Sequence, residues 1–313
     1  QRFYGGRLLI MTEDHGEPDV ITAWRTVLGH HARGAFNPRE IETIRREVLP
    51  SLPCEPTEIG IISPYNEQVN ALHRELGGGV DVATVHKFQG REKEAIILST
   101  VDDQITAFTD DPNLLNVAVS RAKRQFTLVT SSNEQPDSRN IADLLAYIDY
   151  NGGKITESAI HSVFDLLYEP YAEARREFLK RHRRISEFDS ENLTYALLER
   201  VLEADPAFRH LGVLCHQPLR QLIRDWTLLN DEERRYASNG ATHLDFLIYN
   251  RVSKRPVLAV ETDGYQFHKQ GTRQSERDRM KDRILDRYAL PLLRLSTTGT
   301  DEEAKIQTLL KRN

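Results

Sequence analysis

Short apolar runs alternate with amphipathic runs along the first half of the chain, and this alternation limits the fold more than any other feature. The predicted strands cover residues 7–11, 58–63, 80–85, 94–101 and 125–131, and the predicted helices cover 37–49, 66–76 and 113–122. Asn37 and Pro38 provide an N-cap and a first-turn proline for the first helix. Strands and helices that alternate in this way predict a parallel sheet with helices on both faces.

The second half has a different order of elements. A helix is predicted at 190–202, strands at 212–217, 243–250 and 256–262, a helix at 273–289 and a last strand at 291–296. The order is α-β-β-β-α-β, and 313 residues exceed one typical domain. We therefore predict an α/β fold with domains at 1–132 and 186–313, joined by a helical connector at 133–185.

Composition limits the function classes. The net charge is −5, so any contact with nucleic acid must use local basic patches. The basic run 173–184 fits either a track for a phosphate backbone or a solvated helix face. Cys54 and Cys215 lack metal-ligand spacing and indicate reduced thiols in a cytoplasmic protein. No apolar run approaches the roughly 18 residues of a membrane span, and the first residue, Gln1, leads us to expect part of a longer protein.

A charged turn, "VHKFQGREKEAII" at 85–97, stands between two predicted strands. We expect it at the carboxyl end of the strand 80–85, the edge at which parallel sheets bind ligands. Downstream, Arg121 is a candidate arginine finger, a planar cation that offsets charge on a transferring phosphoryl group. Taken singly, Gln89-Gly90 also fits a plain turn, and Arg121 also fits a solvated helix face.

Four segments in order resemble one family. "TVHKFQGREKEAIILS" resembles motif V, and "LLNVAVSRAKRQFTLV" motif VI, of superfamily 1 helicases of the Upf1-like (Dna2/Nam7) type. "IGIISPYNEQVNAL" and "FYGGRL" (3–8) are similar to segments of the same second RecA-like domain. The resemblance covers about residues 1–132. It implies that ATP is bound between this domain and a first RecA-like domain.

The resemblance also implies two sets of site residues. The positions that match nucleotide-facing residues are Gln89, Gly90, Glu92 and Arg121. The positions that match residues near the nucleic-acid backbone are Ser63, Tyr65, Thr84 and His86. Many relatives carry Asp where His86 stands. The 313 residues contain no phosphate-binding G-x-x-x-x-G-K-[ST] loop, so we expect the first RecA-like domain elsewhere in the same chain or in another, and ATP use only in the complete protein.

Acidic residues interrupt two apolar strands of the second half. Asp245 lies in "HLDFLIYN", and Glu261 and Asp263 lie in "PVLAVETDG". An acid within an apolar strand is costly unless it is paired or binds a metal. Oxygen ligands favour Mg²⁺ or Mn²⁺ over zinc, so these three acids predict a divalent-metal site that activates water.

The same region resembles the PD-(D/E)XK nuclease superfamily, close to its very-short-patch-repair branch. The resemblance rests on Ser190-Glu191, Asp245-Phe246, "VETDGYQFH" (260–268), "RDRMKD" (277–282) and "LPLLRL" (290–295). It implies that Asp245 and Glu261 are the main metal ligands and that Asp263 occupies the usual lysine position.

Three further roles follow from the resemblance. Glu191 would be an accessory acid, and His268 would be a general acid or would orient a phosphate. Lys281 or Arg277 would supply the missing positive charge. An alternative remains in which Asp245 and Asp263 cap turns and His268 is a surface histidine.

Together these features predict the C-terminal part of a helicase fused to a Mg²⁺-dependent nuclease, with a restriction-endonuclease-like second domain. DNA is favoured over RNA as the partner, in repair or anti-phage defence. One rival is a module that clamps nucleic acid or a partner chain without cutting. Another is a signalling ATPase that binds no nucleic acid.

Overall fold

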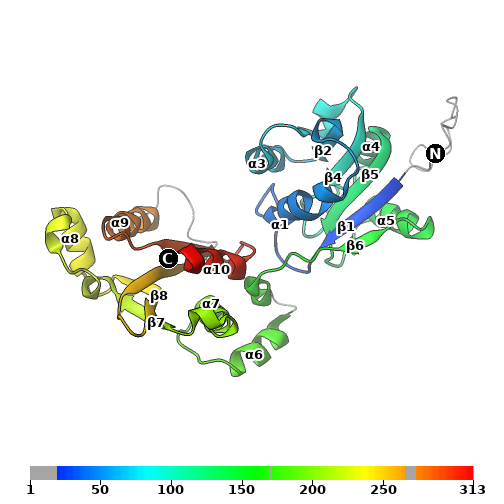
Figure 1. The fold of residues 1–313 in the computed structure, drawn as a ribbon. Coiled ribbons are helices and arrows are strands. Elements are labelled where there is room, and N and C mark those ends of the chain that lie inside the picture. Colours follow the sequence, from blue (N-terminus) through cyan, green and yellow to red (C-terminus); the bar gives the residue numbers. More distant parts are fainter. Residues whose placement is uncertain (1–19, 169–170, 265–272, 313) are drawn as a thin grey trace, which may run out of the picture. The chain divides into compact units, whose positions relative to one another are not determined.

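The structure is a computed structural model that describes residues 20–168, 171–264 and 273–312. The chain forms two units, one up to Ile160 and one from His161 onward, and each is described by itself (Figure 1). The predicted strand at 7–11, the segment at 3–8 and His268 lie outside the described residues.

The first unit is built on a six-stranded sheet in the order β3-β2-β4-β5-β1-β6. The strands are β1 (Val20–Thr26), β2 (Ile59–Ser63), β3 (Asp81–Thr84), β4 (Lys93–Ser99), β5 (Ala122–Ser131) and β6 (Ile155–Glu157). Every neighbouring pair is parallel, which confirms the predicted parallel sheet. This arrangement fits a RecA-like domain.

Helices cover both faces of this sheet, as the alternation predicted. They are α1 (Pro38–Thr43), a π-helical turn (Ile44–Val48), α2 (Leu49–Ser51), α3 (Asn66–Leu76), α4 (Pro112–Ser120) and α5 (Asn140–Tyr150). Apolar residues of α1 and α3 pack into one core, and those of α4 and α5 pack into another. The side chain of Asn37 accepts hydrogen bonds from the backbone N–H groups of Arg39 and Glu40, which is the predicted N-cap.

The charged turn that follows β3 runs from the carboxyl ends of the strands back to their amino ends. Thr84 ends β3 beside Ser63, the last residue of β2, whereas β4 begins beside the start of β2. A 3-10 helix, Val85–Phe88, carries the chain back between these two points. A Cβ at Gly60 would lie 2.5 Å from Cζ of Phe88, so this crossing needs a glycine in β2. Residues 89–92 therefore precede the amino end of β4, and their predicted place at the carboxyl end of β3 is wrong.

The second unit holds a mixed four-stranded sheet in the order β10-β9-β8-β7. The strands are β7 (Leu211–Pro218), β8 (His243–Asn250), β9 (Pro256–Asp263) and β10 (Leu292–Ser296). β8 pairs antiparallel with both β7 and β9, and β10 pairs parallel with β9. With α7 (Asp189–Ala204) before them and α9 (Arg273–Arg287) before β10, the predicted α-β-β-β-α-β order is present.

Three further helices complete the second unit. They are α6 (Ala172–Lys180), α8 (Asp231–Ser238) between β7 and β8, and α10 (Glu302–Arg312) at the end of the chain. The predicted connector at 133–185 is divided: α5 and β6 join the first unit, and α6 belongs to the second. Among the described residues, no helix is both long and apolar enough to cross a membrane.

Candidate functional site

The residues predicted to face a nucleotide lie together at the amino ends of strands β4 and β5 in the first sheet. Gln89, Gly90 and Glu92 are exposed in the turn before β4. Gly90 has a φ of 80°, a conformation that favours glycine. The backbone N–H of Lys93 donates to the carbonyl of Arg121 at 3.0 Å, which brings the end of α4 beside this turn.

The Arg121 side chain is partly buried, and its guanidinium donates to Oγ of Ser120 at 3.1 Å. A guanidinium that is held by a neighbour loses less rotational freedom when it binds an anion. The four predicted nucleotide-facing positions thus form one polar region.

The residues predicted to contact nucleic acid lie at or just after the carboxyl ends of β2 and β3. The Tyr65 hydroxyl donates to Oδ1 of Asp102 at 2.9 Å, and its ring centroid lies 5.4 Å from that of Phe108. His86 is exposed, whereas Ser63 and Thr84 are buried. Tyr65 and His86 are therefore the members of this set that a nucleic-acid strand can reach, because Ser63 and Thr84 are buried.

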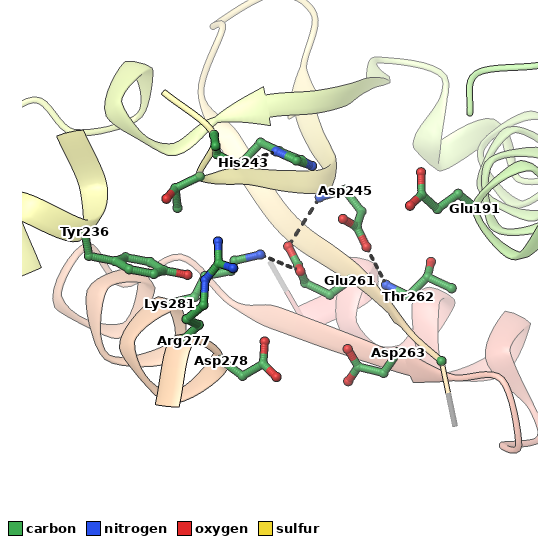
Figure 2. A pocket seen from close by; sticks show the side chains of 13 residues that line it. Glu191, Tyr236, His243, Asp245, Glu261, Thr262, Asp263, Arg277, Asp278 and Lys281 are labelled. Atoms are coloured by element: carbon green, nitrogen blue, oxygen red, sulfur yellow. Dashed lines mark hydrogen bonds and ion pairs between the residues drawn. The ribbon is translucent and has the colours of Figure 1, made fainter. Parts of the chain in front are cut away.

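In the second unit, two acids face each other on neighbouring strands. Phe246 pairs with Val260, so Asp245 and Glu261 stand opposite each other. The backbone N–H of Asp245 donates to Oε1 of Glu261 at 3.3 Å, and Oδ2 of Asp245 accepts from the N–H of Thr262 at 2.9 Å (Figure 2). The strand register therefore positions both carboxylates.

A cation from the next helix reaches these acids. The Lys281 ammonium on α9 lies 2.6 Å from Oε2 of Glu261, which is only 5% exposed (Figure 2). Burial raises the pKa of Glu261 to about 7, Lys281 acts against this rise, and Asp245 adds to it. Burial likewise raises the pKa of Asp245. One lysine thus offsets only part of the cost of burying two carboxylates, and a second positive charge would be favourable here.

These residues line a pocket of about 300 Å³. The predicted catalytic residues on its wall are Glu191, Asp245, Glu261, Asp263, Lys281 and Arg277 (Figure 2). They come from α7, β8, β9 and α9, so the fold brings together positions up to 90 residues apart in sequence. Every predicted catalytic residue that the structure describes lines this pocket.

The predicted three-acid metal cluster is not formed. Asp263 is bound by the Arg294 guanidinium at 3.1 Å. Among the described residues, no group of three or more His, Cys, Asp or Glu side chains is arranged to hold a metal ion. Mg²⁺ is commonly held by one or two carboxylates together with water and substrate phosphate. The donor set that remains, Asp245 and Glu261, fits this mode.

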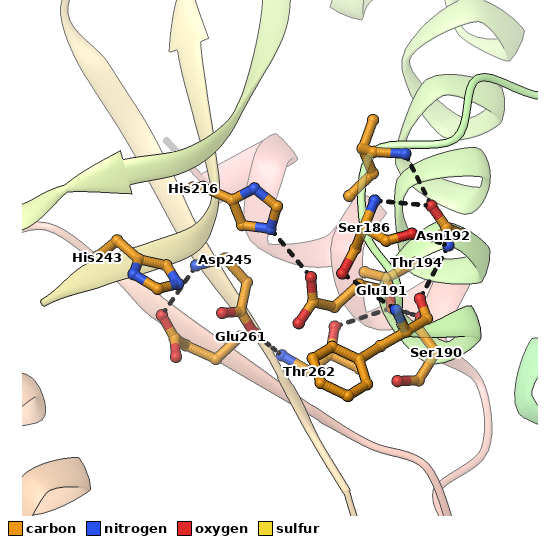
Figure 3. Close-up of polar contacts among 12 residues, drawn as sticks. Ser186, Ser190, Glu191, Asn192, Thr194, His216, His243, Asp245, Glu261 and Thr262 are labelled. Carbon is orange, nitrogen blue, oxygen red and sulfur yellow. Dashed lines mark hydrogen bonds and ion pairs between the residues drawn. The ribbon is translucent and has the colours of Figure 1, made fainter. Parts of the chain in front are cut away.

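Two histidines beside the pocket were missed in the sequence. Nε2 of His216 on β7 lies 3.0 Å from Oε2 of Glu191, and the His243 ring packs edge-on against His216 with centroids 5.5 Å apart (Figure 3). His216 has a φ of 49°, which is rare for a residue in a strand. Its partner Glu191 lies 25 positions earlier, so no local pattern could link the two.

Two family comparisons match the chain, one within each of its two units. Residues 23–133 match the family described as "AAA domain". Residues 188–312 match the family described as "Protein of unknown function (DUF2726)". The first match includes β2 to β5 and most of β1 but not β6, and the second includes all four strands of the other sheet. The second description assigns no activity.

Several curated relatives are named as helicases. The chicken (Gallus gallus) "DNA replication ATP-dependent helicase/nuclease DNA2" is 40% identical over 84 residues, 24% of this chain and 8% of the relative. The Saccharomyces cerevisiae "DNA polymerase alpha-associated DNA helicase A" is 38% identical over 114 residues, 33% of this chain and 16% of the relative. The chain thus spans less than a sixth of either protein's length.

One solved structure, the C-terminal domain of a possible DNA helicase from Lactobacillus plantarum, gives a TM-score of 0.32 at 17% identity, over 45% of this chain and 87% of that one. This TM-score is too low to support a statement about the fold. By its sequence matches and its six-stranded parallel sheet, the first unit is similar to the C-terminal RecA-like domain of superfamily 1, ATP-dependent helicases.

Proposed function

We propose that the chain joins half of a nucleic-acid motor to a divalent-metal-dependent nuclease of the PD-(D/E)XK type, with DNA favoured over RNA. The observation that carries the nuclease proposal is the pairing of Asp245 with Glu261 across two strands, beside Lys281, in one pocket. The superfamily's lysine position is held by Asp263. Lys281 supplies a cation from the neighbouring helix instead.

Each side chain has a distinct part in this proposal. Asp245 and Glu261 would hold Mg²⁺ or Mn²⁺, which supplies Lewis acidity and a more acidic water when bound. Lys281 offsets negative charge on the phosphate as the bond to the leaving oxygen breaks. Glu191, paired with His216, stands on the other wall of the pocket, where a carboxylate orients a water or accepts its proton.

For the first unit we propose that ATP binds between this domain and another RecA-like domain, with Arg121 stabilising the transferring phosphoryl group. In a protein that carries both domains, Arg121→Ala should lower ATP hydrolysis by about 10³-fold. Lys123→Ala is the matched control, since Lys123 is exposed and lies 3.9 Å from Glu94. ATP hydrolysis unchanged in Arg121→Ala would refute the finger role.

A non-cleaving module is the second candidate, and one observation favours it. Lys281 already pairs with Glu261, and Arg294 already pairs with Asp263. Acids that are compensated in this way can serve a purely structural role, since removing one partner of such a pair leaves an uncompensated charge. This candidate predicts binding of nucleic acid without cutting.

Cleavage separates the two candidates. Single- and double-stranded DNA and RNA would be incubated with the chain in Mg²⁺, Mn²⁺ or EDTA, beside Glu261→Gln and Asp245→Asn. Glu302→Gln is the matched control, since Glu302 is an equally buried acid of the same unit that accepts a hydrogen bond from Ser162 outside the pocket. We expect metal-dependent cutting that falls about 10³-fold in the two pocket variants, because a held metal contributes several kcal/mol.

Two results would contradict the nuclease proposal. Cutting that is equal in Glu261→Gln and the native chain would come from another site or a contaminant. Binding without cutting in every metal would favour the non-cleaving module.

A further inference from the structure

A strongly basic segment lies outside the pocket, on the last turns of α6 and the residues that follow. Its exposed cations are Arg176, Lys180, Arg181, Arg183 and Arg184. Lys180 pairs with Glu177 at 2.5 Å. For the other four, no ion pair is formed within the described part of the chain. A segment that leaves most of its cations unpaired is poised to bind an anion.

All of these cations except Arg181 border a groove of about 340 Å³ between α6 and the start of α7. The groove is lined by Arg175, Arg176, Lys180, Arg183 and Arg184, with Asp189 and Asn192 of α7 on the other side. The Arg175 guanidinium lies 3.2 Å from Asp189, so the acid of this groove is already neutralised. What remains is a concave surface with an excess of positive charge.

Asn192 ties the basic segment to the helix that enters the catalytic pocket. Its Oδ1 accepts from the backbone N–H groups of Ile185 and Ser186 at 2.8 and 3.1 Å, and its Nδ2 donates to the Ser186 carbonyl at 2.9 Å (Figure 3). Glu191, the preceding residue, lines the pocket. The charges of Arg183 and Glu191 also act in opposite directions on the pKa of the Cys215 thiol, so both lie near this residue of β7. The groove therefore adjoins the pocket wall.

We propose that this groove binds the phosphate backbone of a nucleic-acid strand and directs it toward the Asp245–Glu261 pocket. That the strand is directed toward the pocket rests on the proposed nuclease function, whereas the binding of the strand in the groove does not. Phe188 lies between the basic segment and Glu191 and is 58% exposed, which provides a face on which a base can stack. A solvated helix face, the alternative from the sequence, would make no difference to nucleic-acid affinity.

The salt dependence of binding tests the proposal. Anisotropy of labelled single-stranded and duplex DNA would be measured from 50 to 300 mM NaCl for the native chain and for Arg183→Glu/Arg184→Glu, which changes two exposed residues of the groove. The matched control is Lys311→Glu/Arg312→Glu, which makes the same change of charge on exposed residues of α10. Each lost phosphate contact lowers the slope of log K against log salt by about 0.7 for single strands and about 0.9 for duplex.

We expect the groove variant to lose about 1.4 to 1.8 units of slope and at least tenfold in affinity at 100 mM salt, while the control keeps the native slope. Arg183→Gln/Arg184→Gln should show a smaller loss in the same direction, which guards against misfolding of the charge-reversal variant. Phe188→Ala should weaken single-strand binding by about tenfold with the slope unchanged. An unchanged slope in the groove variant, or an equal loss in the α10 control, would overturn the proposal.

Cutting distinguishes failure of this proposal from failure of the nuclease proposal. Glu261→Gln should bind DNA with the native slope but not cut it. The groove variant should cut with a raised KM and a native kcat. A native KM in the groove variant would overturn the groove proposal, even if Glu261→Gln abolishes cutting.

Discussion

Glu40 in the first unit and Glu261 in the second are both buried glutamates with a raised pKa, and their environments differ in kind. Glu40 in the first unit is fully buried and accepts hydrogen bonds from Oγ of Ser99, Oγ1 of Thr100 and the backbone N–H of Val101 at 2.5, 3.1 and 3.0 Å. Glu261 in the second unit is nearly as buried, but it shares a pocket of about 300 Å³ with Asp245 and forms an ion pair with Lys281.

The comparison shows that a raised pKa alone does not mark a functional site. Burial raises the pKa of Glu40 to about 8 and that of Glu261 to about 7. Glu40 is held by neutral donors that join α1 to the end of β4, so we assign it a structural role. Glu261 meets a second acid at a cavity wall, where a bound cation and a substrate have room.

The largest expected effect concerns the structural role of Glu40. Glu40→Ala leaves the Ser99 hydroxyl and the Val101 N–H in the core without an acceptor, so the free energy of unfolding of the first unit should fall by about 3 kcal/mol or more. Trp24 lies in the first unit and Trp226 in the second, so urea unfolding in a Trp226→Phe background reports the first unit through Trp24. A loss below 1 kcal/mol would contradict the structural role.

Glu42→Ala on the same helix is the control for that experiment. Glu42 pairs with Arg45 at 2.7 Å at a partly exposed position. Surface pairs of this kind contribute at most about 1 kcal/mol. The control should therefore change the unfolding free energy little.

The second prediction concerns pH. Because burial raises the pKa of Glu40 from 4.5 to about 8, the folded state binds this proton more tightly than the unfolded state. The stability contributed by this group is fully present below about pH 4.5 and is lost as the pH rises through about 8. The unfolding free energy of the first unit should therefore decline over this range. In Glu40→Gln that decline should be smaller, and an identical pH profile in variant and native chain would show that Glu40 does not titrate there.

The smallest expected effect concerns His216, beside the pocket that holds Glu261. His216→Ala removes the partner of Glu191, so cutting should slow by about tenfold, while the unfolding free energy changes little. His216→Gln, which retains a donor, should recover part of the rate. His210→Ala is the control, since His210 is an exposed histidine of the same unit. Equal rates for His216→Ala and His210→Ala would remove His216 from the site.

Much of the fold was accessible from the sequence because period and length are local signals. The predicted strand at 58–63 is β2, and the one at 256–262 is β9 to within one residue. β1 was missed because "VITAWRT" carries a tryptophan and an arginine and lacks a continuous apolar run. Residues 89–92 were assigned to the wrong edge because no period shows that a 3-10 helix returns the chain across β2.

The site was partly predictable for a related reason. Acids within apolar strands are conspicuous, and Asp245 and Glu261 were predicted on that ground. Glu40 was not, because an acid in the first turn of a helix is ordinary and its burial depends on Ser99, 59 positions away. Asp263 was assigned to the metal by its sequence position, whereas Arg294 on the parallel strand β10 binds it instead. Long-range pairing decided each of these outcomes.

The most direct test of the distinction between the two glutamates is Mn²⁺ binding, measured by electron paramagnetic resonance on the native chain, Glu261→Gln and Glu40→Gln. The account predicts that the native chain and Glu40→Gln bind Mn²⁺ alike, and that Glu261→Gln binds it at least about tenfold more weakly. Equal affinity in Glu261→Gln and the native chain would contradict the assignment of Glu261 as a metal ligand.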